Sequence, residues 1–474
     1  MFIYEIIAGE IGAAIASGQL PPGSRIASIR ECSERHSVSV NTIKAAYRIL
    51  EDRGLITARP QSGYFVNSKI SELSVPAAVV EDKEKIPLNG INKLLAFILG
   101  KCADEQYVDF ALAYPVGENY YPSSRLKKLT SQVLRSKKSS IGSYVLPPGS
   151  LRLRSQIARR GLQMGMSLSA EDILLTHGAM EAINLAVRAT TRPGDGVAIE
   201  TPTFYNLYPM LEDAGRRIIE IPTHPRTGMC LDTLQNKISL NQVAAVLTIP
   251  SGHNPLGFTM PVENRQRLAH MANVNQVAVI EDAIYSELQY TPQTIPNIKS
   301  FDEDGWVLVC ASYTKIVAPD FRIGWLDAGR FRDVARQLKF TSTVAEPEML
   351  AETLGLFLEN GSYDLHLRHL KRLYSKKIDA VRALIEQYFP LGTRVSRPEC
   401  GFILWIELPE GSDTLRLFHD ALEEKIICMP GALCSGNKSF NHCLRLAVCF
   451  DFDDRRIHAL RRLGQLADEQ LQAR

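Results

Sequence analysis

The sequence lacks the features that mark membrane proteins and disulfide-stabilised secreted domains. No stretch approaches the roughly 20 uninterrupted apolar residues that span a bilayer. The first residues, MFIYEIIAGE, carry acids early and have no basic stretch before an apolar core, so no secretory signal is expected. The nine cysteines are an odd number and form no CxxC pair. We therefore expect neither a disulfide framework nor a structural zinc site, and we predict a cytoplasmic protein.

The chain also lacks a strong charge of either sign. Its formal net charge is +2, with 45% hydrophobic and 22% charged residues, which is typical of ordinary globular protein. This balance argues against coating of nucleic acid by the whole surface, but it leaves room for a small DNA-binding module. At 474 residues the chain exceeds what one core would normally fill, so several compact units are expected.

The composition changes once, near residue 70. Residues 1–68 are helix-patterned and end in the hairpin-like stretch ARPQSGYFV, and we interpret them as one domain. Residues 69–88 are polar, clustered in charge and almost without period, which predicts a linker. From 89 to 474, short apolar runs alternate with helical stretches and no repeat is visible. The sequence thus predicts a multi-domain protein with a mostly helical head and an α/β body.

The head has the pattern of three helices followed by a β-hairpin. Isoleucines at 3, 7, 11 and 15 form one stripe of an amphipathic helix, which Gly18 and the PPG at 21–23 end. A second helix is expected over Ile26–Arg35. The hairpin is expected over Leu55–Val66, with Ser62-Gly63 at its tip.

The third helix is predicted to begin at Ser39, a good N-cap. Its apolar face carries Ile43, Ala46, Tyr47 and Leu50, and its opposite face carries Asn41, Lys44 and Arg48. A short helix, a tight turn and a helix with a cationic outer face is the geometry that enters a DNA major groove. The pattern alone leaves open a charged face that is merely solvated.

The head resembles the GntR-type winged helix-turn-helix through nearly its whole length, from PPGSRIASIRE to ITARPQSGYFV. The resemblance implies that double-stranded operator DNA is a partner. It also implies contacts to DNA by Arg30, Ser39, Asn41, Thr42 and Lys44, with Gly63 at the wing tip. Two positions depart from the family pattern: Ala27 stands where Pro is usual, and Val40 where many members have Arg. The second departure removes a common phosphate or base contact.

The body contains five apolar runs suited to buried strands, at 173–176, 197–200, 243–249, 277–281 and 306–310. Helical stretches separate most of them, which predicts a mostly parallel sheet with helices on both faces. Ligands of such sheets bind at the carboxyl ends of the strands. The residues that follow each run are therefore the candidate site.

Residues suited to a phosphate and a Schiff base follow these strands. Lys315, flanked by Ser312 and Thr314 and followed by Arg322, can form a Schiff base beside a phosphate. The two hydroxyls, the guanidinium and the helix start at Gly178–Met180 can donate hydrogen bonds to an anion.

The same strand ends supply groups that suit a pyridine ring. Asp282 can hold a ring nitrogen protonated, Tyr285 and Asn254 can hydrogen-bond a phenolate oxygen, and Phe204 can stack on the ring. Taken singly, each has a commoner explanation: a solvated lysine, a helix cap, a turn at Asn254-Pro255, a core phenylalanine. Their joint occurrence, each at a strand end, favours a site for pyridoxal 5′-phosphate.

These motifs resemble the fold type I aminotransferases over residues 89–474, with a smaller C-terminal α+β subdomain implied. THGAME, the Asn254-Pro255-x-Gly257 turn, Asp282-x-x-Tyr285, Ser312-x-Thr314-Lys315 and Arg322-x-Gly324 occur in that family's order. The resemblance implies that Lys315 is the catalytic residue that carries the internal aldimine. It implies cofactor binding by Gly178, Ala179, Met180, Phe204, Asn254, Asp282, Tyr285, Ser312, Thr314 and Arg322.

Two further residues follow from this match. Tyr144, five residues before Gly149, resembles the tyrosine that reaches across a dimer interface to the other subunit's phosphate. The resemblance therefore implies a homodimer whose sites are completed across the interface. CLRLA at 443–447 resembles the strand whose arginine binds the substrate carboxylate, which makes Arg445 the candidate. The alternative for Arg445 is a surface charge on a strand.

A GntR-like head joined to an aminotransferase-like body resembles the MocR subfamily of bacterial transcription regulators. The resemblance implies a DNA-binding regulator that senses an amino acid or amine by aldimine exchange at Lys315. The alternative is a competent aminotransferase with an autoregulatory DNA-binding head, and the sequence does not distinguish the two. The segment AlaTyrPro at 113–115 is expected to line the pocket.

Overall fold

The computed structural model describes residues 3–16, 19–52, 55–59, 62–67, 73, 88–115, 117–136, 144–291 and 293–473. Most of the linker predicted at 69–88, and the hairpin residues 60–61, therefore lie outside the described residues. Among the described residues, no helix is both long and apolar enough to cross a bilayer.

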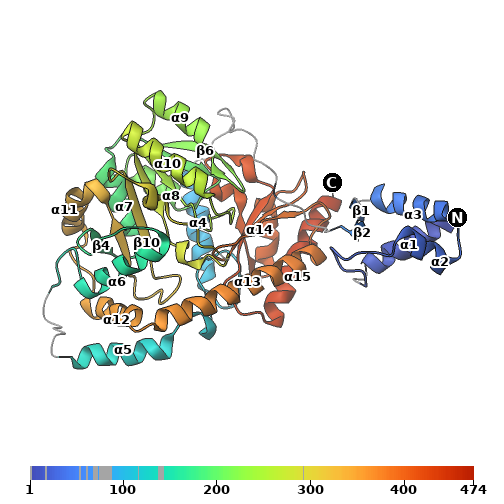
Figure 1. Ribbon diagram of the computed structural model, residues 1–474, viewed down its shortest axis with the longest axis horizontal. Helices are drawn as coiled ribbons and strands as arrows, with labels where there is room; N and C mark the ends of the chain where they lie inside the picture. The colour runs from blue at the N-terminus through green and yellow to red at the C-terminus, as the bar shows by residue number, and fades with distance from the viewer. Residues whose placement is uncertain are drawn as a thin grey trace.

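The head contains the predicted elements, which Figure 1 shows together at one end of the molecule. They are helices α1 (Ile3–Ala16), α2 (Ile29–His36) and α3 (Val40–Asp52) and the antiparallel strands β1 (Ile56–Arg59) and β2 (Gly63–Val66). The predicted apolar face of α3 is confirmed: Ile43, Ala46, Tyr47 and Leu50 are at most 1% exposed. The predicted stripe of isoleucines on α1 is confirmed only in part. Ile3 is 59% exposed, and Tyr4 packs against the core of the head in its place.

The second helix begins at Ile29, and the prediction that it starts at Ile26 is wrong. Ser28 caps this helix: its hydroxyl accepts the N–H of Glu31 (3.3 Å), and the Glu31 carboxylate accepts the N–H of Ser28 (2.7 Å). Such a reciprocal capping box fixes the first turn. Ile26 lies before it and donates its N–H to the carbonyl of Tyr64 in the hairpin. Ile26 is therefore apolar because it packs beside the hairpin, not because it lies in the helix.

The body is built on an eight-stranded sheet in the order β4-β11-β10-β9-β8-β5-β6-β7. The strands are β4 (Ile173–Thr176), β5 (Gly196–Thr201), β6 (Arg217–His224), β7 (Gly228–Met229), β8 (Ala245–Thr248), β9 (Ala278–Asp282), β10 (Val307–Ser312) and β11 (Gly324–Asp327). Strands β10, β9, β8, β5 and β6 pair in parallel, whereas β11 runs antiparallel to both β10 and β4. The predicted strands and the mostly parallel sheet are confirmed.

Helices cover both faces of this sheet (Figure 1). Side chains alternate along a strand, so Leu174 of β4 packs with one layer of helices and Leu175 with the other. The first layer contains α7 (Ala179–Thr190), α8 (Leu207–Asp213) and α11 (Arg332–Ser342). The second contains α6 (Leu151–Gly161), α9 (Leu231–Ser239), α10 (Val262–Asn275) and α12 (Glu348–Glu359), with α5 (Ser123–Arg135) outside them.

A smaller α+β subdomain packs beside the large sheet, as predicted. Its four-stranded sheet has the order β12 (Arg394–Val395), β13 (Ile403–Glu407), β16 (Cys443–Ala447) and β15 (Met429–Pro430). Helices α4 (Leu88–Cys102), α13 (Ser362–Tyr388), α14 (Thr414–Glu423) and α15 (Asp454–Gln472) share its core. Strand β3 (Val108–Asp109) pairs with β14 (Ile426–Ile427). The subdomain is therefore not purely C-terminal, because α4 and β3 also belong to it.

Two glycines meet where β11 passes the start of α7. A Cβ on Gly324 would lie 2.5 Å from the carbonyl carbon of Gly178 and 2.7 Å from the carbonyl oxygen of Ala311. Both neighbours are backbone atoms in strongly hydrogen-bonded surroundings, so they have little room to move. Glycine is thus required at 324 for β11 to lie this close to the helix start.

Gly324→Ala should therefore destabilise the body by about 1–3 kcal/mol, as overpacking does, and weaken cofactor binding. Denaturant unfolding and a titration with pyridoxal 5′-phosphate measure the two effects. Gly100→Ala in α4 is the control, because nothing lies within 4 Å of its Cβ. Unchanged stability and cofactor affinity in Gly324→Ala would contradict the steric argument.

Candidate functional site

A cavity of about 230 Å³ lies at the carboxyl ends of the parallel strands. Each of β4, β5, β8, β9 and β10 contributes residues from its end or from the loop after it, because parallel strands end at the same edge of a sheet. The lining residues foreseen from sequence are Ala113, Ala179, Met180, Phe204, Asn254, Asp282, Tyr285, Thr314, Lys315 and Arg322. The structure thus brings together residues that span more than 200 positions of the chain.

One end of the cavity concentrates hydrogen-bond donors. Gly178 precedes α7 with φ 79°, and the first N–H groups of a helix have no partner within it. Arg322 lies against this helix start, with Nη2 3.4 Å from the carbonyl oxygen of His177. A Cβ on Gly178 would lie 3.0 Å from that Nη2, so the glycine admits the guanidinium. A helix N-terminus and an arginine together suit a phosphate.

Ser312 and Thr314 are coupled to each other at this end. Their hydroxyl oxygens are 2.9 Å apart, and the N–H of Thr314 donates to Ser312 Oγ (3.0 Å). Only Thr314 lines the cavity, whereas Ser312 lines a separate space behind β10. The predicted contact of Ser312 with the phosphate therefore finds no direct support in this geometry: Ser312 holds Thr314 in place.

Lys315 is one of the residues that line the cavity. Its Nζ donates a hydrogen bond to the carbonyl oxygen of Ala113. Burial, with the positive charges of Arg445 and Arg322, lowers the pKa of Lys315 to about 8. Near neutral pH an appreciable fraction of this amine is uncharged, and the uncharged amine is the form that attacks an aldehyde.

Asp282 is the last residue of β9 and is 5% exposed. Burial raises its pKa to about 7; the N–H of Ile284, 3.1 Å from Oδ1, opposes this shift, and the negative charges of Glu200 and Glu281 add to it. A cation beside the carboxyl group would restore its charged form. A protonated pyridine nitrogen is such a cation, so the site fits the ring of pyridoxal 5′-phosphate.

Asn254 and Tyr285 flank the same space. Asn254 Oδ1 is buried and has no hydrogen-bond partner within the described part of the chain, and the Asn254–Pro255 bond is cis. Burial raises the pKa of Tyr285 far above its usual value, so the phenol stays neutral and able to donate. An unpartnered amide and a neutral phenol suit a ligand with a ring oxygen.

Arg445 is the least satisfied charge near the cavity. It sits in β16 and is fully buried, so the alternative of a surface charge is wrong. Its Nε, Nη1 and Nη2 find no hydrogen-bond partner among the residues described, and the guanidinium lies 5.6 Å from the centroid of the Tyr205 ring. A buried cation without hydrogen-bond partners is costly, and a ligand carboxylate would accept from two of these nitrogen atoms in a bidentate pair.

Tyr144 is not brought to the cavity of its own chain. Its side chain is 82% exposed, and it follows the undescribed residues 137–143. Its role across a dimer interface stays a prediction.

Sequence reasoning missed several apolar lining residues: Leu99, Leu112, Ile183, Ile249 and Ile284, together with Asn206. Leu99 belongs to α4, far from every motif. In sequence these side chains have the ordinary spacing of core residues, so no local signal distinguishes them.

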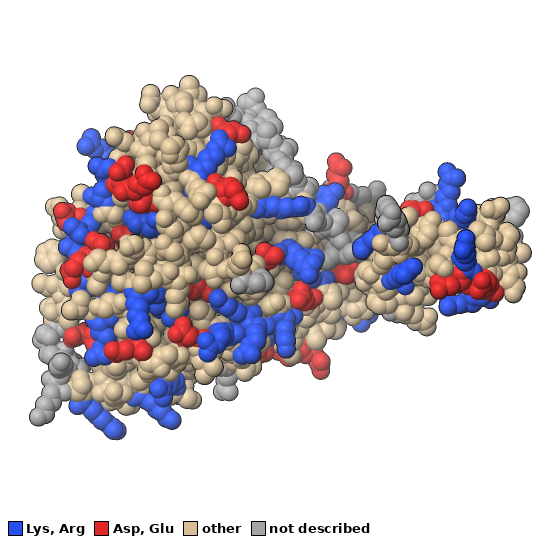
Figure 2. Space-filling model, viewed as in Figure 1, with Lys and Arg blue, Asp and Glu red and all other residues tan. Residues whose placement is uncertain are grey.

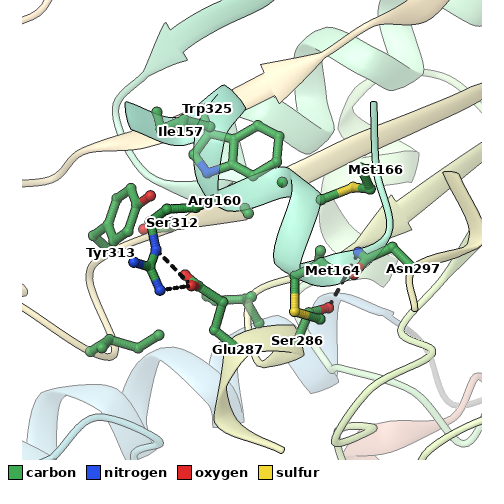
Figure 3. Close-up of a pocket in the computed structure, with 15 residues that line it drawn as sticks. Ile157, Arg160, Met164, Met166, Ser286, Glu287, Asn297, Ser312, Tyr313 and Trp325 are labelled. Carbon is green, nitrogen blue, oxygen red and sulfur yellow. Dashed lines mark hydrogen bonds and ion pairs between the residues drawn. The ribbon is translucent and has the colours of Figure 1, made fainter. Parts of the chain in front are cut away.

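A second, smaller space lies behind the segment Ser312–Tyr313 (Figure 3). Its volume of about 30 Å³ suits one or two water molecules rather than a ligand. Figure 3 shows Arg160 reaching Glu287, with nitrogen–oxygen distances of 2.7 and 2.9 Å. Arg160 also donates to Asp364 (2.9 Å). Because Glu287 follows Tyr285 by two residues, this ion pair fastens the segment that carries the tyrosine.

A cluster of His177, Glu181 and Glu346 has the donor types of a cation site. The buried ammonium group of Lys339 already occupies it, with Nζ 2.9 Å from Glu181 and also paired with Glu346. The cluster is therefore an ion-pair network that anchors the start of α7.

The head presents its predicted DNA-contacting residues on the surface. Arg30, Asn41 and Lys44 are exposed. Ser39 caps α3 as predicted: its hydroxyl accepts the N–H of Thr42 (3.2 Å) and pairs with the Thr42 hydroxyl (2.8 Å). Figure 2 shows basic and acidic side chains together on this end of the molecule, as over the body.

Two further details concern the same surface. Val40, one of the two positions expected to depart from the family pattern, is 40% exposed at the start of α3. Gly63 has φ 100°, and a Cβ there would lie 3.1 Å from Nε of Arg25. Arg25 was not foreseen in sequence, and it adds an exposed cation beside the wing.

Comparison with known families supports the predicted nature of both the head and the body. Residues 3–66 match the bacterial regulatory proteins of the gntR family, and residues 113–460 match the aminotransferases of class I and II. The chain is 33% identical over 469 residues to an uncharacterized HTH-type transcriptional regulator, YdcR, of Escherichia coli K12, covering 99% of both chains.

Solved structures resemble the body. The multiple substrate aminotransferase of Thermococcus profundus matches with a TM-score of 0.74 and 26% identity over 80% of this chain and 96% of that one. LysN, an α-aminoadipate aminotransferase of Thermus thermophilus complexed with N-(5′-phosphopyridoxyl)-L-leucine, has the same fold, with a TM-score of 0.74 and 24% identity over 81% of this chain and 98% of LysN.

The fold and the site thus define a transcription regulator with an aminotransferase-like body. The chain belongs to the GntR-type regulators that carry an aminotransferase class I and II domain, the MocR architecture. Its cofactor is pyridoxal 5′-phosphate, in agreement with the phosphate-binding end, Lys315 and Asp282 described above.

The lowered pKa of Lys315 gives a testable pH dependence. Because the neutral amine attacks the aldehyde, the rate of loading with pyridoxal 5′-phosphate should rise with pH and level off above about 8. Stopped-flow absorbance measures this rate. Nα-acetyl-lysine is the control, because its amine has a pKa of about 10.4 and its rate should still rise between pH 8 and 10. A protein profile like that of the free amine would contradict the effect of burial.

Proposed function

We propose that this protein is a pyridoxal 5′-phosphate-dependent transcription regulator that senses an amino acid or amine by exchange at Lys315. The observation that carries this proposal is Arg445, a fully buried cation with three unpartnered nitrogen atoms beside a cofactor cavity. In a chain whose head presents a DNA-binding helix, such a site for a carboxylate gives the body a ligand to detect.

In this proposal, each group of residues at the cavity has its own role in holding the cofactor or the effector. The cofactor supplies an aldehyde carbon that reacts with primary amines. Lys315 holds that carbon until another amine replaces it, and Asp282 keeps the ring nitrogen charged. Thr314, Arg322 and the start of α7 hold the phosphate. Arg445 receives the effector's carboxylate.

Coupling to DNA requires that the effector bind one arrangement of the body more tightly than another. The cavity supports this because residues of both subdomains line it. Asp282 ends a strand of the large sheet and Lys315 follows another, whereas Leu99 comes from the smaller subdomain. Arg445, also of the smaller subdomain, lies beside the lining residue Tyr205. A ligand held by both sides favours their closure, and a change in closure would reposition the heads.

The exposed Tyr144 supports the further proposal that two chains form a homodimer in which each completes the other's site. Two heads would then bind two half-sites of an operator. We place this regulator in the cytoplasm, where DNA and free thiols are both found.

A working aminotransferase is the second candidate function. The pKa of Lys315, about 8, favours it, because a displaced lysine of that pKa can act as a proton-transferring base near neutral pH.

Visible absorbance of the loaded protein, titrated with amino acids and small amines, tests both candidates. A stable spectral change with an amine, accompanied by changed DNA affinity, supports the regulator. Conversion to the pyridoxamine form, reversed by a keto acid, supports the enzyme. A protein whose spectrum no amino compound alters would contradict both.

Lys315→Ala should keep DNA affinity but lose the response of that affinity to the effector. Electrophoretic mobility shifts with an operator selected from random duplexes measure both properties. Lys128→Ala, at an exposed position of α5, is the matched control and should respond like the native protein. An intact response in Lys315→Ala would rule out sensing through this residue.

Lys44→Ala should weaken DNA binding and its salt dependence. Each lost phosphate contact lowers the slope of log affinity against log salt by about 0.9. Fluorescence anisotropy between 50 and 300 mM KCl, roughly the range in which such slopes are linear, measures the change. Lys128→Ala again serves as the control, and an unchanged slope in Lys44→Ala would place this residue off the DNA.

A further inference from the structure

We propose that the effector is an α-amino acid with a single carboxylate and an uncharged, apolar side chain, and that Leu99 of α4 is the specificity-determining residue that contacts this side chain. The inference rests on the proposed function above. It concerns which amino compound the cavity accepts, a property that the motifs of the cofactor site do not set.

The charges around the cavity leave room for one carboxylate. Among the described lining residues, only Lys315 and Arg322 are basic, and only Asp282 is acidic. Lys315 is the reacting amine, Arg322 lies at the phosphate end, and Asp282 is matched to the ring nitrogen. Arg445, with its three unpartnered nitrogen atoms, is the remaining cation. A second carboxylate or a second ammonium group on the effector would find no partner of opposite charge.

The remaining lining residues are uncharged and mostly apolar, and the neutral polar groups among them include Asn206 and the hydroxyl groups of Tyr205 and Tyr285. Leu112 and Ile284 line the cavity together with Leu99. Leu112 directly precedes Ala113, whose carbonyl oxygen accepts the hydrogen bond from Lys315 Nζ. Leu112 is therefore next to the reacting amine. Burying a charged side chain against such a wall without a partner is costly.

Leu99 reaches the cavity from the smaller subdomain, which also carries Arg445. Its helix α4 packs into the core of the smaller subdomain through Leu95 and Ile98, which leaves Leu99 half-buried toward the cavity. Tyr205 lines the same cavity, and the guanidinium of Arg445 lies 5.6 Å from the centroid of its ring. Leu99 and Arg445 thus both belong to the part of the smaller subdomain that faces this cavity.

The first test compares amino acids on the full-length, cofactor-loaded protein by visible absorbance. L-leucine, L-methionine and L-phenylalanine are set against L-aspartate, L-glutamate and L-lysine. The half-saturating concentration for at least one apolar amino acid should be 10-fold or more below those for all three charged ones. A charged amino acid that saturates at the lowest concentration overturns the inference.

The second test introduces a positive charge into the apolar wall of the cavity. Leu99→Arg should lower the half-saturating concentration of L-glutamate relative to L-leucine by 10-fold or more. Ala96→Arg is the control, because Ala96 is exposed on the same helix and adds the same charge away from the cavity. It should keep the native preference. Equal preferences in the two arginine variants would overturn the role of Leu99.

A third variant covers the case in which Leu99→Arg does not load the cofactor. Leu99→Phe keeps the wall apolar but narrows it, so it should raise the half-saturating concentration of L-phenylalanine at least 10-fold more than that of L-alanine. Equal effects on both would overturn the placement of Leu99. A loaded native protein that responds to no amino compound would instead refute the proposed function itself.

Discussion

The site depends on one constraint: parallel strands of a sheet all end at the same edge. Because β4, β5, β8, β9 and β10 run in one direction, the residues after them meet at one cavity, although the chain separates them widely. The antiparallel strand β11 returns between β10 and β4 and brings Arg322 to the start of α7. Because neither Gly324 nor Gly178 has a side chain, β11 can pass close to the start of α7. The end of the cavity that suits a phosphate is therefore formed by the order of the strands and by these two glycines.

The cavity holds charges that the protein alone does not satisfy. Arg445 is buried without acceptors among the described residues, Asp282 has a pKa of about 7, and Lys315 has a pKa of about 8. The unpaired charge of Arg445 and the shifted pKa values of Asp282 and Lys315 all reflect burial without enough partners. In the proposed complex, the effector's carboxylate would pair with Arg445, the ring nitrogen with Asp282 and the aldehyde carbon with Lys315. Binding therefore contributes free energy to whichever arrangement encloses the ligands. This is the physical basis on which the body of a regulator could respond to a small molecule.

The head and the body of this nearly neutral chain differ in the role of their charged side chains. The head concentrates its polar and cationic side chains at the start of α3 and beside the wing, where Lys44 and Arg25 are exposed. The body mixes both signs of charge over its surface (Figure 2). In the proposed regulator, DNA affinity would be local to the head, and moving the heads would change it without any change in the charge of the chain.

The sequence by itself determined five of the eight strands of the large sheet (β4, β5, β8, β9 and β10), the motif residues that follow them, the apolar face of α3 and the cap at Ser39, because these depend on spacing and on local hydrogen bonds. Only the tertiary structure decided the rest. It turned Ser312 toward the smaller space rather than the cavity, left Tyr144 exposed, buried Arg445 without a hydrogen-bond partner among the described residues and delivered Leu99 to the cavity wall. The start of α2 was misplaced because Ile26 looks helical, yet it packs with the hairpin. A side chain's neighbours across elements carry no periodic signal in sequence, since they depend on how distant segments pack.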